Sequence, residues 1–329
     1  MIAYGYPVHL AIIQNGGETR QESVFRLWQI YMAASREYET FYREALSKRF
    51  PADLPIEEIR AYHETIMKGY PPAPEVRFEP FSIGALPGAW AFAPDVNRRK
   101  IILFFMGGGF TVGSIESQKN FIGRLSAATG AAVCAIQYRL APENPYPAAL
   151  DDALTAYRWL LHHPYARSKI LFSGISAGGG LALSLFLRLK LQKIAMPAGA
   201  LLFCPWVDLR LRGESYHSNK GKDLLSSEML SWCAEKYAAG KDLADPFLSP
   251  LYGDLEGLPP LFIQTGAREL LHAEALQLAE IAQKQGGSIT LDVWTDMVHA
   301  WQLFAPQYPE AQEAIERAGQ FVDQLFKKQ

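Results

Sequence analysis

The chain has 329 residues, of which 49% are hydrophobic and 20% are charged, and its formal net charge is −2. This length suits one large α/β domain or two modest ones. The small net charge gives no reason to expect nucleic acid or an anionic membrane surface as a partner. The three cysteines, Cys134, Cys204 and Cys233, form no CxxC pair. They favour a reducing compartment over a disulfide framework or a zinc site.

The first 17 residues have neither a basic start nor a long apolar run. We interpret them as a loose leader and not as a secretory signal. No stretch of the chain approaches the roughly 18 consecutive apolar residues of a membrane span. These features predict a cytoplasmic protein without a membrane span.

From the N-terminus onward, residues 20–68 place apolar side chains at helical spacing, with a separate short helix over 56–67. Beyond a proline cluster, short apolar runs alternate with helix-length segments. The runs are AWAFAP, KIILFFM, AAVCAIQY, KILFSGI, GALLFCPW, PLFIQTGA and ITLDVW. The predicted helices between and after them cover 118–128, 147–161, 177–193, 272–284 and 309–326. This alternation predicts an α/β fold with a mainly parallel central sheet flanked by helices.

The segment 208–255 interrupts this alternation, with a predicted helix near 227–239 between loops. Ligands of such sheets bind at the carboxyl ends of the strands. We expect this segment and the N-terminal helices to form a helical cap over those ends. The predicted division is therefore an N-terminal cap segment over 1–70, a core over 71–207 and 256–329, and a cap insert over 208–255.

The segment KILFSGISAGGGLALSL contains the pattern G-x-S-x-G, formed by Gly174, Ser176 and Gly178. A predicted strand precedes the pattern and a predicted helix follows it, which is the context of a nucleophile elbow. A side chain at either glycine would collide with neighbouring segments in so sharp a turn. Ser176 is therefore the candidate nucleophile.

Three glycines follow the strand at residues 101–106, in the sequence MGGGFTVGS. They fit neither a phosphate loop nor a dinucleotide loop, which need other spacings. In a hydrolase, main-chain N–H groups of such a run stabilise the oxyanion, together with the N–H after the nucleophile. This predicts an oxyanion hole from Gly108, Gly109 and Ala177.

The chain resembles the hormone-sensitive-lipase-like family of α/β-hydrolases, especially its bacterial carboxylesterases and monoterpene ε-lactone hydrolases. The resemblance covers roughly residues 70–305, in family order. It rests on MGGGFTVGS, YRLAPENPYPAALDDA, GISAGGGLAL, CPWVDL with GES, DPFLSPL, GARELL and DMVHAWQLF. Two positions depart from the family pattern. Met106 stands where histidine normally precedes the glycines, and Ile175 stands where an acidic or small polar residue is usual.

A serine hydroxyl needs a base, and the α/β-hydrolase order Ser–acid–His points to His299 on the loop after the last predicted strand. The resemblance of DMVHAWQLF to the family's histidine segment implies the same residue. For the acid, the loop after the penultimate strand and the family spacing favour Glu269. Asp296 and Asp245 are the open alternatives.

The predicted function is a serine carboxylic-ester hydrolase that uses an acyl-enzyme and neither a metal nor an organic cofactor. The resemblance implies short to medium acyl esters, with lactones as a further class, and a homodimer. Phe110, Trp206 and Trp301 are predicted to line the substrate pocket, with a core position as the equal alternative. Two other functions remain open on the sequence: an inactive small-molecule binding protein, and acyl transfer or amide hydrolysis by the same residues.

Overall fold

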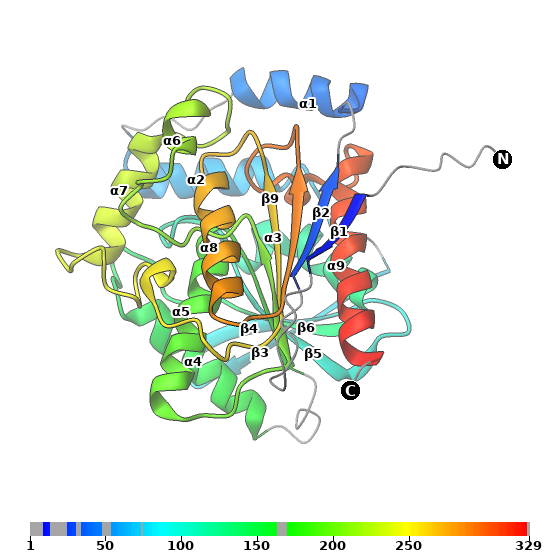
Figure 1. Cartoon of the computed structure of the whole chain (residues 1–329), viewed down its shortest axis with the longest axis vertical. Coiled ribbons are helices and arrows are strands. Elements are labelled where there is room, and N and C mark those ends of the chain that lie inside the picture. The colour runs from blue at the N-terminus through cyan, green and yellow to red at the C-terminus, as the bar shows by residue number, and fades with distance from the viewer. Residues whose placement is uncertain are drawn as a thin grey trace.

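A computed structural model describes residues 9–13, 25–30, 34–47, 54–73, 75–162 and 170–327 of the chain (Figure 1). Its described strands form one ten-stranded sheet in the order β1-β2-β10-β9-β8-β7-β5-β6-β4-β3. They are β1 (His9–Ile13), β2 (Phe25–Ile30), β3 (Arg77–Ile83), β4 (Leu86–Phe92), β5 (Asn97–Phe105), β6 (Ala131–Ile136), β7 (Ile170–Ile175), β8 (Gly199–Phe203), β9 (Leu261–Gly266) and β10 (Ile289–Trp294).

The central strands of the sheet, from β2 across to β6, run parallel to one another. β6, β7, β9 and β10 are buried along their whole length. Strands covered on both faces carry continuous apolar runs, which is why these runs stood out in the sequence. β1, β4 and β3 pair antiparallel with their neighbours, and β3 is an edge strand whose residues are exposed or partly buried.

Helices cover both faces of the sheet. α3 (Ile115–Thr129) packs against α9 (Pro309–Lys327) on one face, together with the short helix η2 (Trp301–Phe304). The other face carries α4 (Ala148–Leu161), α5 (Ala177–Gln192), α8 (His272–Lys284) and the short helix η1 (Pro250–Tyr252) (Figure 1). None of the helices in the described part of the chain combines the length and apolarity that crossing a membrane requires.

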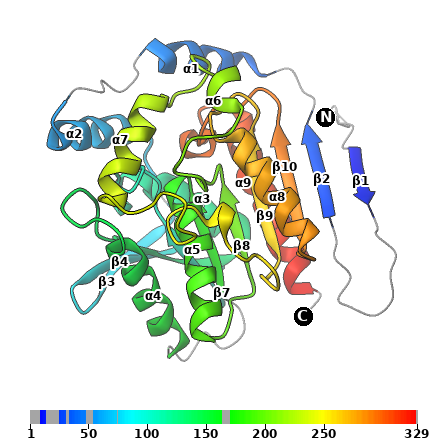
Figure 2. The same cartoon turned by 60° about the vertical axis from the view of Figure 1, so that its left-hand side comes forward.

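Four further helices lie beyond the carboxyl ends of the parallel strands (Figure 2). These are α1 (Arg36–Ser47), α2 (Ile56–Met67), α6 (Ser215–Ser218) and α7 (Ser227–Ala238). They come from the two segments that the sequence assigned to a cap.

The prediction of helix over 20–68 is wrong for residues 25–30, which form β2. β2 pairs parallel with β10, from Phe25 beside Ile289 to Ile30 beside Trp294, and so satisfies the hydrogen-bonding groups of that edge. The predicted leader also contains a strand, β1. Residues 1–8, 14–24, 31–33 and 48–53 of these predicted segments lie outside the described residues. The helix over 56–67 is confirmed.

Candidate active site

Ser176 lies in a sharp turn between β7 and α5, with a backbone φ of 56°. A positive φ is strained for a residue with a side chain, and such strain is characteristic of functional turns. A Cβ on Gly174 would lie 2.1 Å from the carbonyl oxygen of Gly178. A Cβ on Gly178 would lie 2.1 Å from the carbonyl oxygen of Phe105. Both flanking glycines are therefore required by the close packing of the turn.

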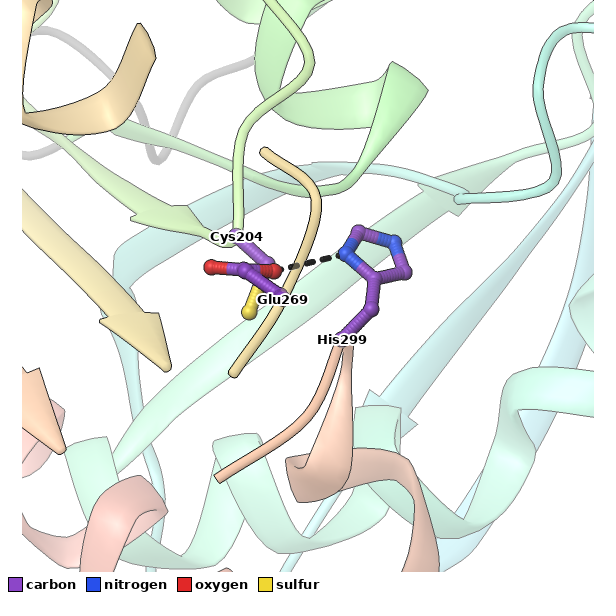
Figure 3. Close-up of side chains that lie close together, drawn as sticks. All are labelled: Cys204, Glu269 and His299. Atoms are coloured by element: carbon purple, nitrogen blue, oxygen red, sulfur yellow. Dashed lines mark hydrogen bonds and ion pairs between the residues drawn. The ribbon is translucent and has the colours of Figure 1, made fainter. Parts of the chain in front are cut away.

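Glu269 and His299 form a buried acid–base pair (Figure 3). Glu269 follows β9 and His299 follows β10, so two adjacent parallel strands deliver both side chains to the same edge of the sheet. His299 Nδ1 lies 2.7 Å from Glu269 Oε2. Glu269 Oε1 accepts hydrogen bonds from the N–H of Gly266, at 3.0 Å, and from the Thr265 hydroxyl. The carboxylate is thereby fixed in an orientation that holds the imidazole.

The two alternative acids have other partners. Asp296 Oδ1 lies 2.6 Å from Arg268 Nη2, and the carboxylate is partly exposed. Asp245 Oδ1 accepts the N–H of Phe247 at 2.8 Å, so it shapes its own loop. Neither side chain is bonded to His299 in the structure.

Ser176 and His299 line one cavity of about 390 Å³, together with the glycine run 107–109. The two side chains form no hydrogen bond here, and contacts of this kind commonly tighten only around a bound substrate. No acceptor among the described residues takes the N–H groups of Gly108, Gly109 or Ala177. Gly108 and Gly109 therefore bring unused donors to the cavity that holds the nucleophile.

The cavity wall is mainly apolar, and much of it comes from α1, α2 and α7. Its large side chains include Phe41, Ile59, Ile66, Met67, Tyr70, Met229, Trp232, Leu303 and Phe304. Sequence reasoning did not assign these residues to the pocket. The amphipathic helices of the predicted cap were the signal that could have found them, because a cap must present an apolar face to the cavity.

The three aromatic residues predicted to line the pocket lie elsewhere. Phe110, Trp206 and Trp301 are all buried and are absent from the cavity wall. Phe110 stacks on Tyr237 with ring centroids 3.8 Å apart, and Trp301 packs against Trp294. Each of the three residues is close in sequence to a motif, but its side chain is packed in the core, which was the alternative position.

Cys204 completes a cluster with the acid–base pair (Figure 3). Single ligand atoms of Cys204, Glu269 and His299 lie within 4.8 Å of one another. Burial and the nearby Glu269 carboxylate raise the pKa of the Cys204 thiol well above its ordinary value. A thiol held in its protonated form is a poor metal ligand, and His299 Nδ1 is already engaged with Glu269. The donor set therefore fits an acid–base pair better than a metal centre.

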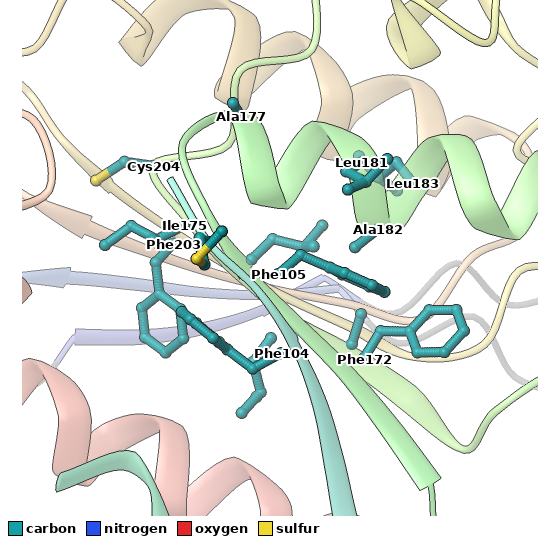
Figure 4. Packing of buried hydrophobic residues seen from close by; sticks show 14 of the residues in the cluster. Phe104, Phe105, Phe172, Ile175, Ala177, Leu181, Ala182, Leu183, Phe203 and Cys204 are labelled. Carbon is teal, nitrogen blue, oxygen red and sulfur yellow. The ribbon is translucent and has the colours of Figure 1, made fainter. Parts of the chain in front are cut away.

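The two positions that depart from the family pattern are fully buried. Ile175 is one of the apolar side chains packed under the nucleophile turn (Figure 4). The carbonyl oxygen of Met106 accepts the Tyr138 hydroxyl at 2.8 Å. A histidine at position 106 would need polar partners, for which the charged residues Arg139 and Glu143 of the next motif are the candidates. Both are already paired: Arg139 bonds Asp152, and Glu143 bonds Arg60 at 2.7 Å.

We therefore predict that Met106→His destabilises the protein by about 1–3 kcal/mol, because the imidazole would be buried without a partner. Thermal unfolding and kcat on p-nitrophenyl butyrate are the measurements. Met106→Leu, an apolar change of similar volume, is the matched control and should change both little. A higher kcat at an unchanged melting temperature for Met106→His would show that polar partners for the ring exist.

Comparison with known proteins places this geometry in a family. Residues 102–303 match the family model of the α/β-hydrolase fold. The chain belongs to this family. Over 255 residues it is 38% identical to an acetyl-hydrolase of Streptomyces hygroscopicus, covering 77% of this chain and 83% of that protein. It is 31% identical to an esterase of Acinetobacter venetianus over 88% of this chain and 97% of that protein.

A solved structure supports the same family assignment. The crystal structure of an esterase from the bacterial hormone-sensitive lipase family superimposes with a TM-score of 0.85 at 35% sequence identity. The alignment covers 89% of this chain and 99% of that protein. The resemblance to this family drawn from the sequence is thus confirmed, and so is the predicted α/β-hydrolase fold.

Proposed function

We propose that this carboxylesterase hydrolyses short to medium acyl esters, lactones included, with Ser176 as nucleophile, His299 as base and Glu269 as the acid that orients the base. The single observation that carries the assignment is the 2.7 Å contact between His299 and Glu269 beside the cavity that contains Ser176. The relatives named esterase and acetyl-hydrolase support ester cleavage and do not favour an inactive binding protein.

The reaction follows from the roles of these groups. Ser176 Oγ attacks the ester carbonyl carbon while His299 Nε2 takes its proton. The negative charge that develops on the carbonyl oxygen is stabilised by the N–H groups of Gly108, Gly109 and Ala177. His299 then gives the proton to the departing alcohol, which leaves an acyl-enzyme. Water, activated by the same imidazole, releases the acid and restores the serine.

Glu269 accepts the Nδ1–H of His299 throughout, which keeps Nε2 free to receive the serine proton. The Thr265 hydroxyl and the Gly266 N–H hold the other carboxylate oxygen and prevent it from rotating away. Glu269 thus orients the imidazole of His299 and supplies the negative charge that stabilises its protonated form.

The remaining assignments are also part of this proposal. The helices α1, α2, α6 and α7 act as the cap that shapes the substrate pocket, with the cap insert over 208–255. The predicted cap segment 1–70 is corrected in one respect, because β1 and β2 belong to the central sheet. The buried free cysteines suit a cytoplasmic protein, and a small ester is the partner, with no nucleic acid. The proposal includes a homodimer. Because β2 pairs with the edge of β10, that edge is not open to a strand of a second copy.

The test is turnover of p-nitrophenyl acetate, butyrate and octanoate by the wild type and by Ser176→Ala. We expect the wild type to hydrolyse the acetate and butyrate esters and Ser176→Ala to fall to background, because no other group replaces the nucleophile. Ser82→Ala, at an exposed position of β3, is the matched control and should keep full activity. Equal rates for the wild type and Ser176→Ala would refute the assignment.

A further inference from the structure

Asp223 is a fully buried carboxylate on the loop between α6 and α7. Its Oδ2 accepts the N–H of Leu270 at 2.8 Å, and its Oδ1 accepts the N–H of His299 at 2.9 Å. Leu270 directly follows Glu269. One side chain of the cap insert therefore joins the loop of the acid to the loop of the base.

Two neighbouring side chains of the same segment bind the acid loop and form no hydrogen bond with His299. Asn219 Nδ2 donates to the carbonyl oxygens of Ala267, at 2.8 Å, and Glu269, at 2.9 Å. The Ser215 hydroxyl donates to the carbonyl oxygen of Leu270. Of these three cap side chains, Asp223 is the one that also reaches His299, and it is the one that can carry a charge.

The titratable groups that face Asp223 are Glu269 after β9, His299 after β10 and Tyr38 on α1. Burial raises its pKa to about 6, the nearby His299 lowers it, and the Glu269 carboxylate raises it. The backbone N–H groups of His299 and Leu270 also lower it. From α1, Tyr38 faces the same region; burial raises the pKa of its hydroxyl, which donates to the Asp296 carbonyl oxygen. Above pH 6 the site therefore holds a second carboxylate beside the imidazole.

We propose that Asp223 is a positioning residue for the acid–base pair, which locks the two catalytic loops together and places a second negative charge near His299. The inference rests on the proposed roles of Glu269 and His299. Catalysis converts His299 to an imidazolium in the transition state. A buried negative charge nearby favours that form, and because Asp223 is fully buried its effect is only weakly screened by water.

The variant Asp223→Asn keeps the size of the side chain and removes its charge; its single oxygen can accept only one of the two backbone N–H groups, so it also loses one of the two loop contacts. Losing a negative charge disfavours the imidazolium form of His299, so the acidic limb of the kcat/KM profile should move to lower pH, by about one unit. The imidazolium of the transition state is disfavoured in the same way, so kcat at neutral pH should fall by about tenfold. KM should change little. A pH-rate profile with p-nitrophenyl butyrate measures all three.

Asn219→Ala is the matched control, since it removes neutral contacts between the same cap segment and the acid loop. We expect it to lower the melting temperature and leave the acidic limb in place. An acidic limb that does not move in Asp223→Asn, or that moves equally in Asn219→Ala, would overturn the proposal. Ser176→Ala separates the two claims, because turnover that survives it refutes the proposed function whatever Asp223 does.

If Asp223→Asn does not fold, the wild type is measured instead. In protein labelled with ¹³C-aspartate, the side-chain carboxyl of Asp223 should be ionised at pH 7.5, which its chemical shift reports. An ionised carboxyl supports the proposal, and a carboxyl that is still protonated at pH 7.5 would overturn it.

Discussion

Glu269→Gln should lower kcat by about 10³–10⁴-fold while the fold and KM stay close to those of the wild type. Oε1 of Glu269 accepts the Gly266 N–H and the Thr265 hydroxyl, so the glutamine oxygen will take this position. The amide NH₂ then faces His299 Nδ1. This NH₂ group donates to Nδ1, which must then act as an acceptor. The ring proton moves to Nε2, and Nε2 can no longer take the proton of the Ser176 hydroxyl.

Asp296→Asn and Asp245→Asn are the controls, because both aspartates were alternatives on the sequence. Asp296 is bonded to Arg268 and Asp245 to its own loop, so each change should alter kcat by only a few-fold. The measurement is kcat on p-nitrophenyl butyrate, with thermal unfolding to verify the fold. A loss of several orders of magnitude in either asparagine variant, with Glu269→Gln still active, would transfer the role of the acid.

The parts of the fold that sequence predicted are those with a local cause. The buried parallel strands are continuous apolar runs, and the helices between them begin and end near the expected residues. β2 was not predicted because its apolar residues do not alternate strictly, and the spacing from Phe25 to Trp28 also suits a helix. Its partner, β10, lies about 260 residues further along the chain. Pairing over that distance leaves no local signal.

In the candidate site, too, the residues that the sequence predicted are those with a local motif or a fixed place in the strand order. Ser176 and the glycine run belong to short motifs, and the acid and base follow from the order of the strands that deliver them. Asp223 has no motif, and its contacts with Leu270 and His299 span 47 and 76 residues. The aromatic wall of the pocket depends on how the cap helices pack, which periodicity alone does not specify. Tertiary packing therefore decided what the sequence missed.

Gly108→Ala should lower kcat by about 10²–10³-fold, the loss that follows removal of an oxyanion donor. Gly108 has a φ of 117°, which residues with a side chain rarely adopt, and a Cβ there would lie 2.2 Å from the Val112 carbonyl oxygen. That oxygen is main chain and cannot turn aside, so the loop must shift. A shift of even a fraction of an ångström misplaces the N–H groups of Gly108 and Gly109.

Gly84→Ala controls for backbone strain alone, because Gly84 has a φ of 59° with nothing within 4 Å of an added Cβ. It should reduce stability slightly and leave kcat unchanged. Gly109→Ala gives a sharper comparison, since its Cβ would meet the Cys233 Sγ, a side-chain atom, at 2.7 Å. Cys233→Ala removes the Sγ but keeps the Cβ, which would lie 3.2 Å from the added atom. Adding it should therefore restore part of kcat to Gly109→Ala but none to Gly108→Ala, whose obstacle is main chain. Rescue of both, or full activity in Gly108→Ala, would mean that the shape of this loop does not control the oxyanion.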